Sequence, residues 1–181
     1  MTYLSLAKIN LFLHVVSKRN DGYHNLQTIF QLLNYGDEME FKSREDGLVN
    51  RNYSNKAIPS NKDLVLKSAY LLKELSGTKK GVDISLIKKI PIGGGLGGGS
   101  SNAATTLIAL NKLWKLNYSK EKLTEIGKTL GSDVPVFLSG KTSWAEGTGE
   151  LLMPITLPKY FYLVVSINKQ ISTQEVFTHK A

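Results

Sequence analysis

Residues 91–104 read PIGGGLGGGSSNAA, with glycine at six of the seven positions from 93 to 99. Each glycine loses more conformational entropy on folding than any other residue, so a run this dense needs a structural reason. The strand-like VDISLIKKI precedes the run, and the helix-like SSNAATTLIALNKLW follows it. The first N–H groups of a helix lack intrahelical partners, and the helix dipole is positive at that end. The stretch therefore predicts a site for a polyphosphate at a helix N-terminus.

Three other interpretations of the glycine run are weaker. A Walker loop is excluded, because no GK[ST] follows the glycines. The dinucleotide fingerprint G-x-G-x-x-G matches at Gly93, Gly95 and Gly98, but six glycines match many such templates by chance. An oxidoreductase would also need an acidic residue at a strand end about twenty residues on, and Glu121 falls in a predicted helix. A flexible hinge does not explain why the run adjoins a well-capped apolar helix.

Composition indicates one globular domain with a basic surface. The 181 residues are 41% hydrophobic and 21% charged, and the absence of cysteine excludes disulfides and thiolate metal sites. A net charge of +8 favours anionic partners, so a nucleic-acid-binding module is kept as an alternative, although the basic residues are scattered. No apolar run reaches membrane-spanning length, and no signal-peptide features begin the chain. We expect a cytoplasmic protein that binds neither membrane nor nucleic acid.

Hydrophobic periodicity predicts an α+β fold. The patterns predict strands at residues 3–16, 26–33, 38–42, 82–90, 141–145 and 160–167 and helices from Asn61 to Gly77, at 100–116 and at 119–130. The second helix should bury Ala103, Ala104, Leu107, Ile108 and Trp114.

Four segments, in order along the chain, resemble the GHMP kinases. They are AKINLFLHVVSKRNDGYHNLQTIFQLLNYGD (7–37), the glycine run, LGSDVPVFLSG (130–140) and AEGTGE (145–150). The resemblance implies the N-terminal domain of that family, a fold shared with a domain of a small-subunit ribosomal protein and known for a left-handed β-α-β crossover. Members of the family continue beyond the point where this chain ends. Residues 1–181 are therefore expected to be the ATP-binding and catalytic domain, without a C-terminal lobe.

The resemblance also implies an activity, which is phosphoryl transfer from ATP, with Mg²⁺, to an alcohol. Within the family the segments are most similar to members acting on a cytidyl diphosphate substrate. The expected acceptor is the 2-hydroxyl of 4-diphosphocytidyl-2-C-methyl-D-erythritol, in the non-mevalonate route to isoprenoid precursors. Another GHMP small-molecule kinase is the alternative.

Two residues are the expected catalytic pair. On the residues alone, Asp133 could simply cap the turn beginning at Val134, and Lys8 could be an edge lysine that extends to solvent. The resemblance places Asp133 on the family's catalytic aspartate and Lys8 on the lysine beside it. Asp133 would then accept the proton of the acceptor hydroxyl, and Lys8 would favour its ionised form.

The resemblance assigns further residues to the two substrates. Asn10, Tyr23 and His24 are expected to bind the cytidyl substrate, with Tyr23 and Phe177 stacking on the base. The nucleotide is expected to contact Pro91, Gly93, Gly94, Gly95, Leu96, Gly97, Gly98, Gly99, Ser100, Ser101, Asn61, Asp63 and Leu64. No acidic cluster marks a magnesium cage, so the metal ligands are open, with Ser100 or Ser101 as the first candidates.

Overall fold

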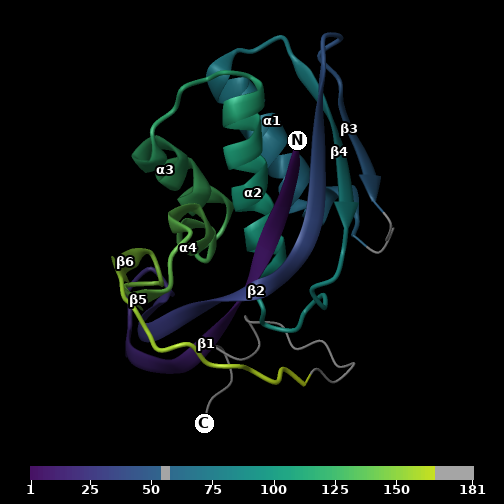
Figure 1. The fold of residues 1–181 in the computed structure, drawn as a ribbon. Coiled ribbons are helices and arrows are strands. Elements are labelled where there is room, and N and C mark those ends of the chain that lie inside the picture. Colours follow the sequence, from purple (N-terminus) through teal and green to yellow (C-terminus); the bar gives the residue numbers. More distant parts are fainter. Residues whose placement is uncertain (54–57, 166–181) are drawn as a thin grey trace.

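In the part of the chain that the structure describes, the fold is a six-stranded sheet with four α-helices packed on one side of it (Figure 1). The structure, a computed structural model, describes residues 1–53 and 58–165. The strands are β1 (Thr2–Lys18), β2 (His24–Arg44), β3 (Val49–Tyr53), β4 (Gly81–Ile87), β5 (Ser143–Glu146) and β6 (Leu151–Pro154). The helices are the short 3₁₀ turn η1 (Ser60–Lys62), α1 (Leu64–Ser76), α2 (Gly98–Leu113), α3 (Lys120–Leu130) and α4 (Val134–Ser139). The predicted α+β class is confirmed.

The long strand β2 lies at the centre of the sheet and pairs with three other strands. It pairs with β1 along its length, with β5 through its first half and with β4 through its second half. Near its middle, a Cβ on Gly36 would lie 2.2 Å from the carbonyl oxygen of Ser5, so only glycine allows β1 this close. The parallel pair β3–β4 is joined through α1, and this is the β-α-β unit for which a left-handed crossover is expected.

Helix α2 fills the centre of the core. Ala103, Ala104 and Leu107 are buried as predicted, and Trp114 is buried with its indole N–H donating to the carbonyl of Gly81. Ile108 was predicted on the same face but is 37% exposed, because it lies at the rim of a surface hollow described below. None of the helices in the described ranges is long and apolar enough to cross a membrane.

Several predicted elements differ from the structure. Residues 26–33 and 38–42 belong to one strand, because Gly36 lets β2 continue past the close approach of β1. The edge strands β3 and β6 were missed, because their exposed positions carry no clear alternation.

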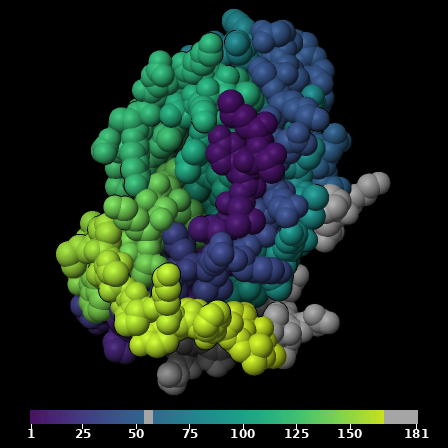
Figure 2. Space-filling model, viewed as in Figure 1, coloured from purple at the N-terminus to yellow at the C-terminus, as the bar shows by residue number. Residues whose placement is uncertain are grey.

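The strand predicted at 160–167 is wrong for its described part. Residues 160–165 form no strand and run along the surface at the end of the described chain (Figure 2). Phe161 and Leu163 are almost fully exposed. A β-strand needs a hydrogen-bonded neighbour, and residues 160–165 pair with none of the described strands.

Candidate functional site

The glycine loop joins β4 to α2 and exposes its backbone. Gly93, Gly95 and Gly97 have φ angles of +76°, +72° and +70°, a left-handed conformation that side chains rarely adopt. A Cβ on Gly95 would meet nothing within 4 Å, so the space in front of the loop is open. The buried Leu96 holds the loop in place, and its carbonyl accepts the N–H of Lys8 at 3.0 Å. The loop is thus an open backbone surface fixed to β1.

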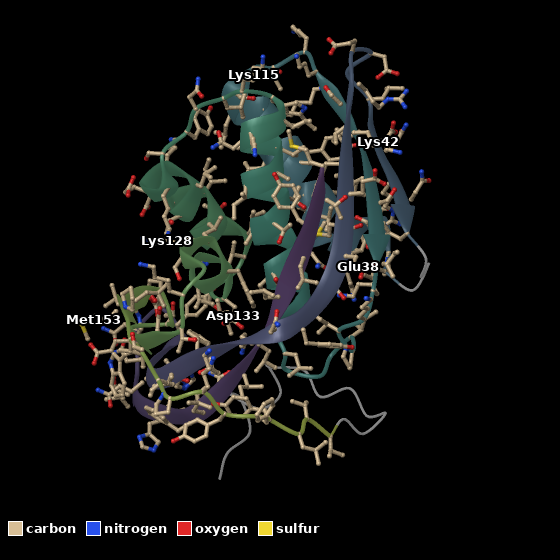
Figure 3. All side chains as sticks on the ribbon, in the orientation of Figure 1. Glu38, Lys42, Lys115, Lys128, Asp133 and Met153 are labelled. Carbon is tan, nitrogen blue, oxygen red and sulfur yellow. The ribbon has the colours of Figure 1, made fainter. Side chains whose placement is uncertain are left out.

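Lys8 and Asp133 meet beside this loop. The Lys8 ammonium lies 3.2 Å from Oδ2 of Asp133, with 8% of the lysine side chain and 30% of the aspartate side chain exposed. Asp133 lies between α4 and the region where β1 crosses β2 (Figure 3). Although Asp133 directly precedes α4, its carboxylate caps no helix N–H. The simple capping interpretation is therefore wrong, and the carboxylate faces Lys8 instead.

A chain of hydrogen bonds fixes Lys8 from the other side. Its ammonium donates to Oδ1 of Asn10 at 2.6 Å, and Nδ2 of Asn10 donates to the hydroxyl of Thr28 at 2.8 Å. Thr28 is fully buried and donates to the carbonyl of Phe12. Thr28 thereby sets which end of the Asn10 amide faces Lys8. No local pattern indicated Thr28, because only the pairing of β1 with β2 brings its side chain within hydrogen-bond distance of Asn10.

The two serines after the loop differ. A Cβ on Gly131 would lie 3.8 Å from the hydroxyl of Ser100, so Ser100 faces the segment that carries Asp133. Ser101 is 1% exposed, and its hydroxyl accepts a hydrogen bond from Ser5 at 2.8 Å. Of the two, Ser100 is better placed to meet a ligand at the loop.

The expected adenine-side residues lie at the start of α1. A Cβ on Gly99 would be 3.6 Å from Leu64, so the N-termini of α1 and α2 are adjacent. Asp63 is 2% exposed, and its carboxylate accepts the N–H of Val65 at 2.9 Å and an Arg51 N–H at 2.6 Å. Its carboxylate therefore makes contacts within the protein, which cap α1 and pair with Arg51. Asn61 is exposed in η1.

Tyr53, on β3, lies next to this ion pair. Its ring lies 5.0 Å from the guanidinium carbon of Arg51. Burial, and then the nearby carboxylate of Asp63, raise the pKa of the Tyr53 phenol above its usual value. The phenol therefore stays neutral at physiological pH.

Two of the residues expected to bind the cytidyl substrate, Tyr23 and His24, lie at the tip of the β1–β2 hairpin, whereas Asn10 lies within β1 beside Lys8. Tyr23 is 63% exposed, and its backbone N–H donates to the carboxylate of Asp21. A hydrogen bond from Arg19, and then the one from Tyr23, lower the pKa of that carboxyl. His24 begins β2 opposite Lys18. The tip presents an open aromatic ring, while Phe177 lies outside the described residues.

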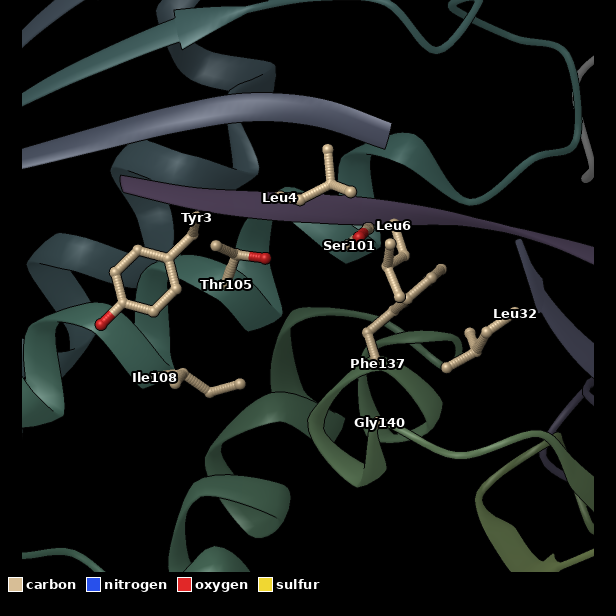
Figure 4. A pocket seen from close by; sticks show the side chains of 9 residues that line it. All are labelled: Tyr3, Leu4, Leu6, Leu32, Ser101, Thr105, Ile108, Phe137 and Gly140. Atoms are coloured by element: carbon tan, nitrogen blue, oxygen red, sulfur yellow. The ribbon is translucent and has the colours of Figure 1, made fainter. Parts of the chain in front are cut away.

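An apolar hollow of about 120 Å³ lies between β1, α2 and α4 (Figure 4). It is lined by Tyr3, Leu4, Leu6, Leu32, Ser101, Thr105, Ile108, Phe137 and Gly140. This lining offers a polyphosphate no positive charge, so the exposed glycine loop remains the better anion site.

The described residues contain no group of three or more histidine, cysteine or acidic side chains suited to a metal. Glu121 lies in the first turn of α3 and not at a strand end, which removes the acidic residue that the oxidoreductase interpretation required.

Comparisons with known proteins indicate the family. Residues 63–141 match the family model described as the GHMP kinases N terminal domain. The chain is 54% identical over 180 residues to the 4-diphosphocytidyl-2-C-methyl-D-erythritol kinase of Ruthia magnifica subsp. Calyptogena magnifica, covering 99% of this chain and 63% of that protein. A solved 4-(cytidine 5'-diphospho)-2C-methyl-D-erythritol kinase has a TM-score of 0.75 at 39% identity, over 87% of this chain and 56% of that one. The homoserine kinase of Cytophaga hutchinsonii shares the fold, with a TM-score of 0.61 at 19% identity, over 94% of this chain and 61% of that one. The chain thus spans about three fifths of the length of its curated relative.

Proposed function

The chain belongs to the GHMP kinase family, and we propose that it supplies the ATP-binding and catalytic residues of a cytidyl-substrate kinase. The acceptor we propose is 4-diphosphocytidyl-2-C-methyl-D-erythritol, phosphorylated on its 2-hydroxyl. Residues 1–181 would form the N-terminal domain of that enzyme.

The observation that carries the proposal is the Lys8–Asp133 pair next to the glycine loop. Lys8 belongs to both parts, because its N–H binds Leu96 of the loop and its ammonium binds Asp133. A Cβ on Gly97 would lie only 3.1 Å from Cγ of Lys8, so the loop and the lysine side chain are in contact. A phosphate on the loop would thus lie close to an acid–base group, as phosphoryl transfer requires.

In the reaction we propose, the acceptor oxygen bonds to the γ-phosphorus of ATP while the bond from that phosphorus to ADP breaks. Asp133 accepts the proton of the acceptor hydroxyl during this step. Lys8 holds the carboxylate in position, and its charge attracts the phosphoryl oxygens that approach. Asn10 and Thr28 keep the lysine directed at this point.

The residues at the loop fit a nucleotide that carries its own magnesium. The open backbone before α2 and the positive end of that helix suit the phosphates. Mg²⁺ bound to ATP needs only one or two protein oxygens, so a dedicated acidic cluster is unnecessary. Ser100 is our candidate for such an oxygen. The ion would supply charge neutralisation at the phosphates.

A substrate panel tests the proposed function. We expect ADP release by the purified protein to be fastest with the cytidyl substrate, and slow with homoserine or mevalonate, the substrates of structural relatives. Equal rates with all three alcohols would still be consistent with the family but would contradict the proposed acceptor.

Tyr23→Ala tests the cytidyl side of the site. Loss of base stacking, worth about 1–3 kcal/mol, should raise KM for the cytidyl substrate roughly 5- to 150-fold and leave KM for ATP unchanged. The matched control is Tyr70→Ala on α1, since Tyr70 is 54% exposed against 63% for Tyr23. Equal KM values in the two variants would exclude Tyr23 from the base site.

Thr28→Val tests the hydrogen-bond chain behind Lys8. Valine keeps the shape but removes the acceptor for Asn10, and one such bond is worth about 1 kcal/mol. We expect kcat to fall about fivefold in steady-state assays. Thr28→Ser retains the hydroxyl and should keep a rate near that of the unsubstituted protein. If valine and serine gave the same kcat, Thr28 would be only a packing residue.

A further inference from the structure

We infer that Asp37 is a positioning residue, whose buried carboxylate anchors both ends of the glycine loop before any nucleotide binds. The inference rests on the proposed function, since it treats the loop as the phosphate site. Asp37 is fully buried and lies more than fifty residues before the loop in the sequence.

The first anchor is the segment that enters the loop. Oδ1 of Asp37 accepts the backbone N–H of Lys89 at 2.7 Å and that of Ile90 at 2.8 Å. These residues directly follow β4, which was predicted to run to Ile90 but ends at Ile87. The carboxylate thus accepts hydrogen bonds from two backbone N–H groups. In a longer β4, such groups could have paired with a neighbouring strand.

The second anchor is the helix that leaves the loop. Oδ2 of Asp37 accepts Nδ2 of Asn102 at 2.9 Å, and Asn102 lies in the second turn of α2. The same amide nitrogen donates to the hydroxyl of Ser5 at 2.9 Å, which ties α2 to β1 as well. One carboxylate therefore binds the chain on each side of residues 91–97.

The charge of Asp37 is balanced by Lys88. The Lys88 ammonium bonds to Oδ2 of Asp37 and lies 3.2 Å from Oδ1 of Asn102. Asp37 is fully buried and the lysine side chain is 7% exposed. A Cβ on Gly98 would lie 3.1 Å from the ammonium, so the pair lies beneath the first residue of α2. A cation at the positive end of a helix is unfavourable without such a carboxylate.

A purely stabilising role explains this arrangement less well. A buried ion pair generally adds little over apolar residues of the same volume. What the Asp37 network provides, and apolar packing could not, is directional bonds to the two ends of a loop that glycine leaves flexible. We therefore conclude that the Asp37 network preorganises the loop.

The test is Asp37→Asn in the purified protein, measured at a temperature where the variant remains folded. The new amide oxygen could still accept from Lys89 and Ile90, but its nitrogen would face Nδ2 of Asn102, donor against donor. We expect amide hydrogen exchange to become about tenfold faster without nucleotide at Lys8 and Ser101, whose N–H groups donate to the carbonyls of Leu96 and Gly97 in the loop. The dissociation constant of ATP should rise by a similar factor, and KM for the acceptor should not change.

Two further variants separate anchoring from stability. Leu110→Ala removes a buried side chain from the far part of α2, so it should lower the melting temperature without changing exchange at Lys8 and Ser101. Asp37→Asn combined with Asn102→Asp exchanges amide and carboxylate, keeps a partner for Lys88, and should restore slow exchange. It also carries the test if the single variant does not fold.

Unchanged exchange at Lys8 and Ser101 of folded Asp37→Asn would overturn the inference, whatever the ATP affinity. Equally fast exchange in Leu110→Ala would do the same, because the effect would then follow stability alone. If the unsubstituted protein bound no ATP, the proposed function would fail, and the exchange rates would still decide whether Asp37 anchors the loop.

Discussion

Asp133→Asn should lower kcat by about 10²- to 10⁴-fold, the usual contribution of a general base. The amide cannot accept the proton of the acceptor hydroxyl, although its oxygen can still bind Lys8. The substitution also removes the counter-charge of Lys8, whose side chain is only 8% exposed, so the melting temperature should fall as well. Steady-state ADP release with the cytidyl substrate, and thermal unfolding, measure the two effects.

Asp83→Asn is the matched control for this prediction. Asp83 also pairs with a basic residue, Arg44, at 3.0 Å, and its side chain is 32% exposed against 30% for Asp133. It lies in β4, and its substitution should leave kcat unchanged. If Asp133→Asn kept a third or more of the original kcat, Asp133 would not be the base.

Gly97→Ala should be the most damaging small substitution in the loop. Gly97 has a φ of +70°, and an added Cβ would lie 2.7 Å from the ring of Phe137 and 3.1 Å from Cγ of Lys8. The left-handed conformation costs about 1–2 kcal/mol, and overpacking about 1–3 kcal/mol. We expect the free energy of unfolding to fall by roughly 2–5 kcal/mol in urea titrations, with weaker ATP binding because Lys8 and the loop must shift.

Gly77→Ala isolates the backbone part of that cost. Gly77 follows α1 with a φ of +65°, and a Cβ there would meet nothing within 4 Å. Its substitution should cost only about 1–2 kcal/mol and leave ATP binding intact. If Gly97→Ala proved no more destabilising than Gly77→Ala, the contact with Phe137 would not limit the residue at position 97.

Local sequence was enough to predict much of the helical structure. The apolar spacing of α1 and α3 is a property of neighbouring residues, and the structure confirms Ser119 as the residue that caps α3, whereas α1 is capped by Asp63 and not by the predicted Asn61. The glycine run likewise predicted a loop before α2, because left-handed backbone conformations strongly favour glycine and are therefore visible in the sequence. The edge strand β3 carries no comparable signal, since its polar residues fit a strand and an irregular loop equally well, and β6 consists of apolar residues and a proline without alternation.

The sequence by itself indicated the family, the glycine loop and the residue types of the proposed site. It left the role of Asp133 divided between a cap and a base, because both uses suit an aspartate before a helix. Only the tertiary structure decided that its carboxylate faces Lys8. Asp37 and Thr28 emerged in the same way, because their partners are distant in sequence and meet only when the strands pair and α2 packs against them. A contact between distant residues has no local pattern, so packing alone reveals it.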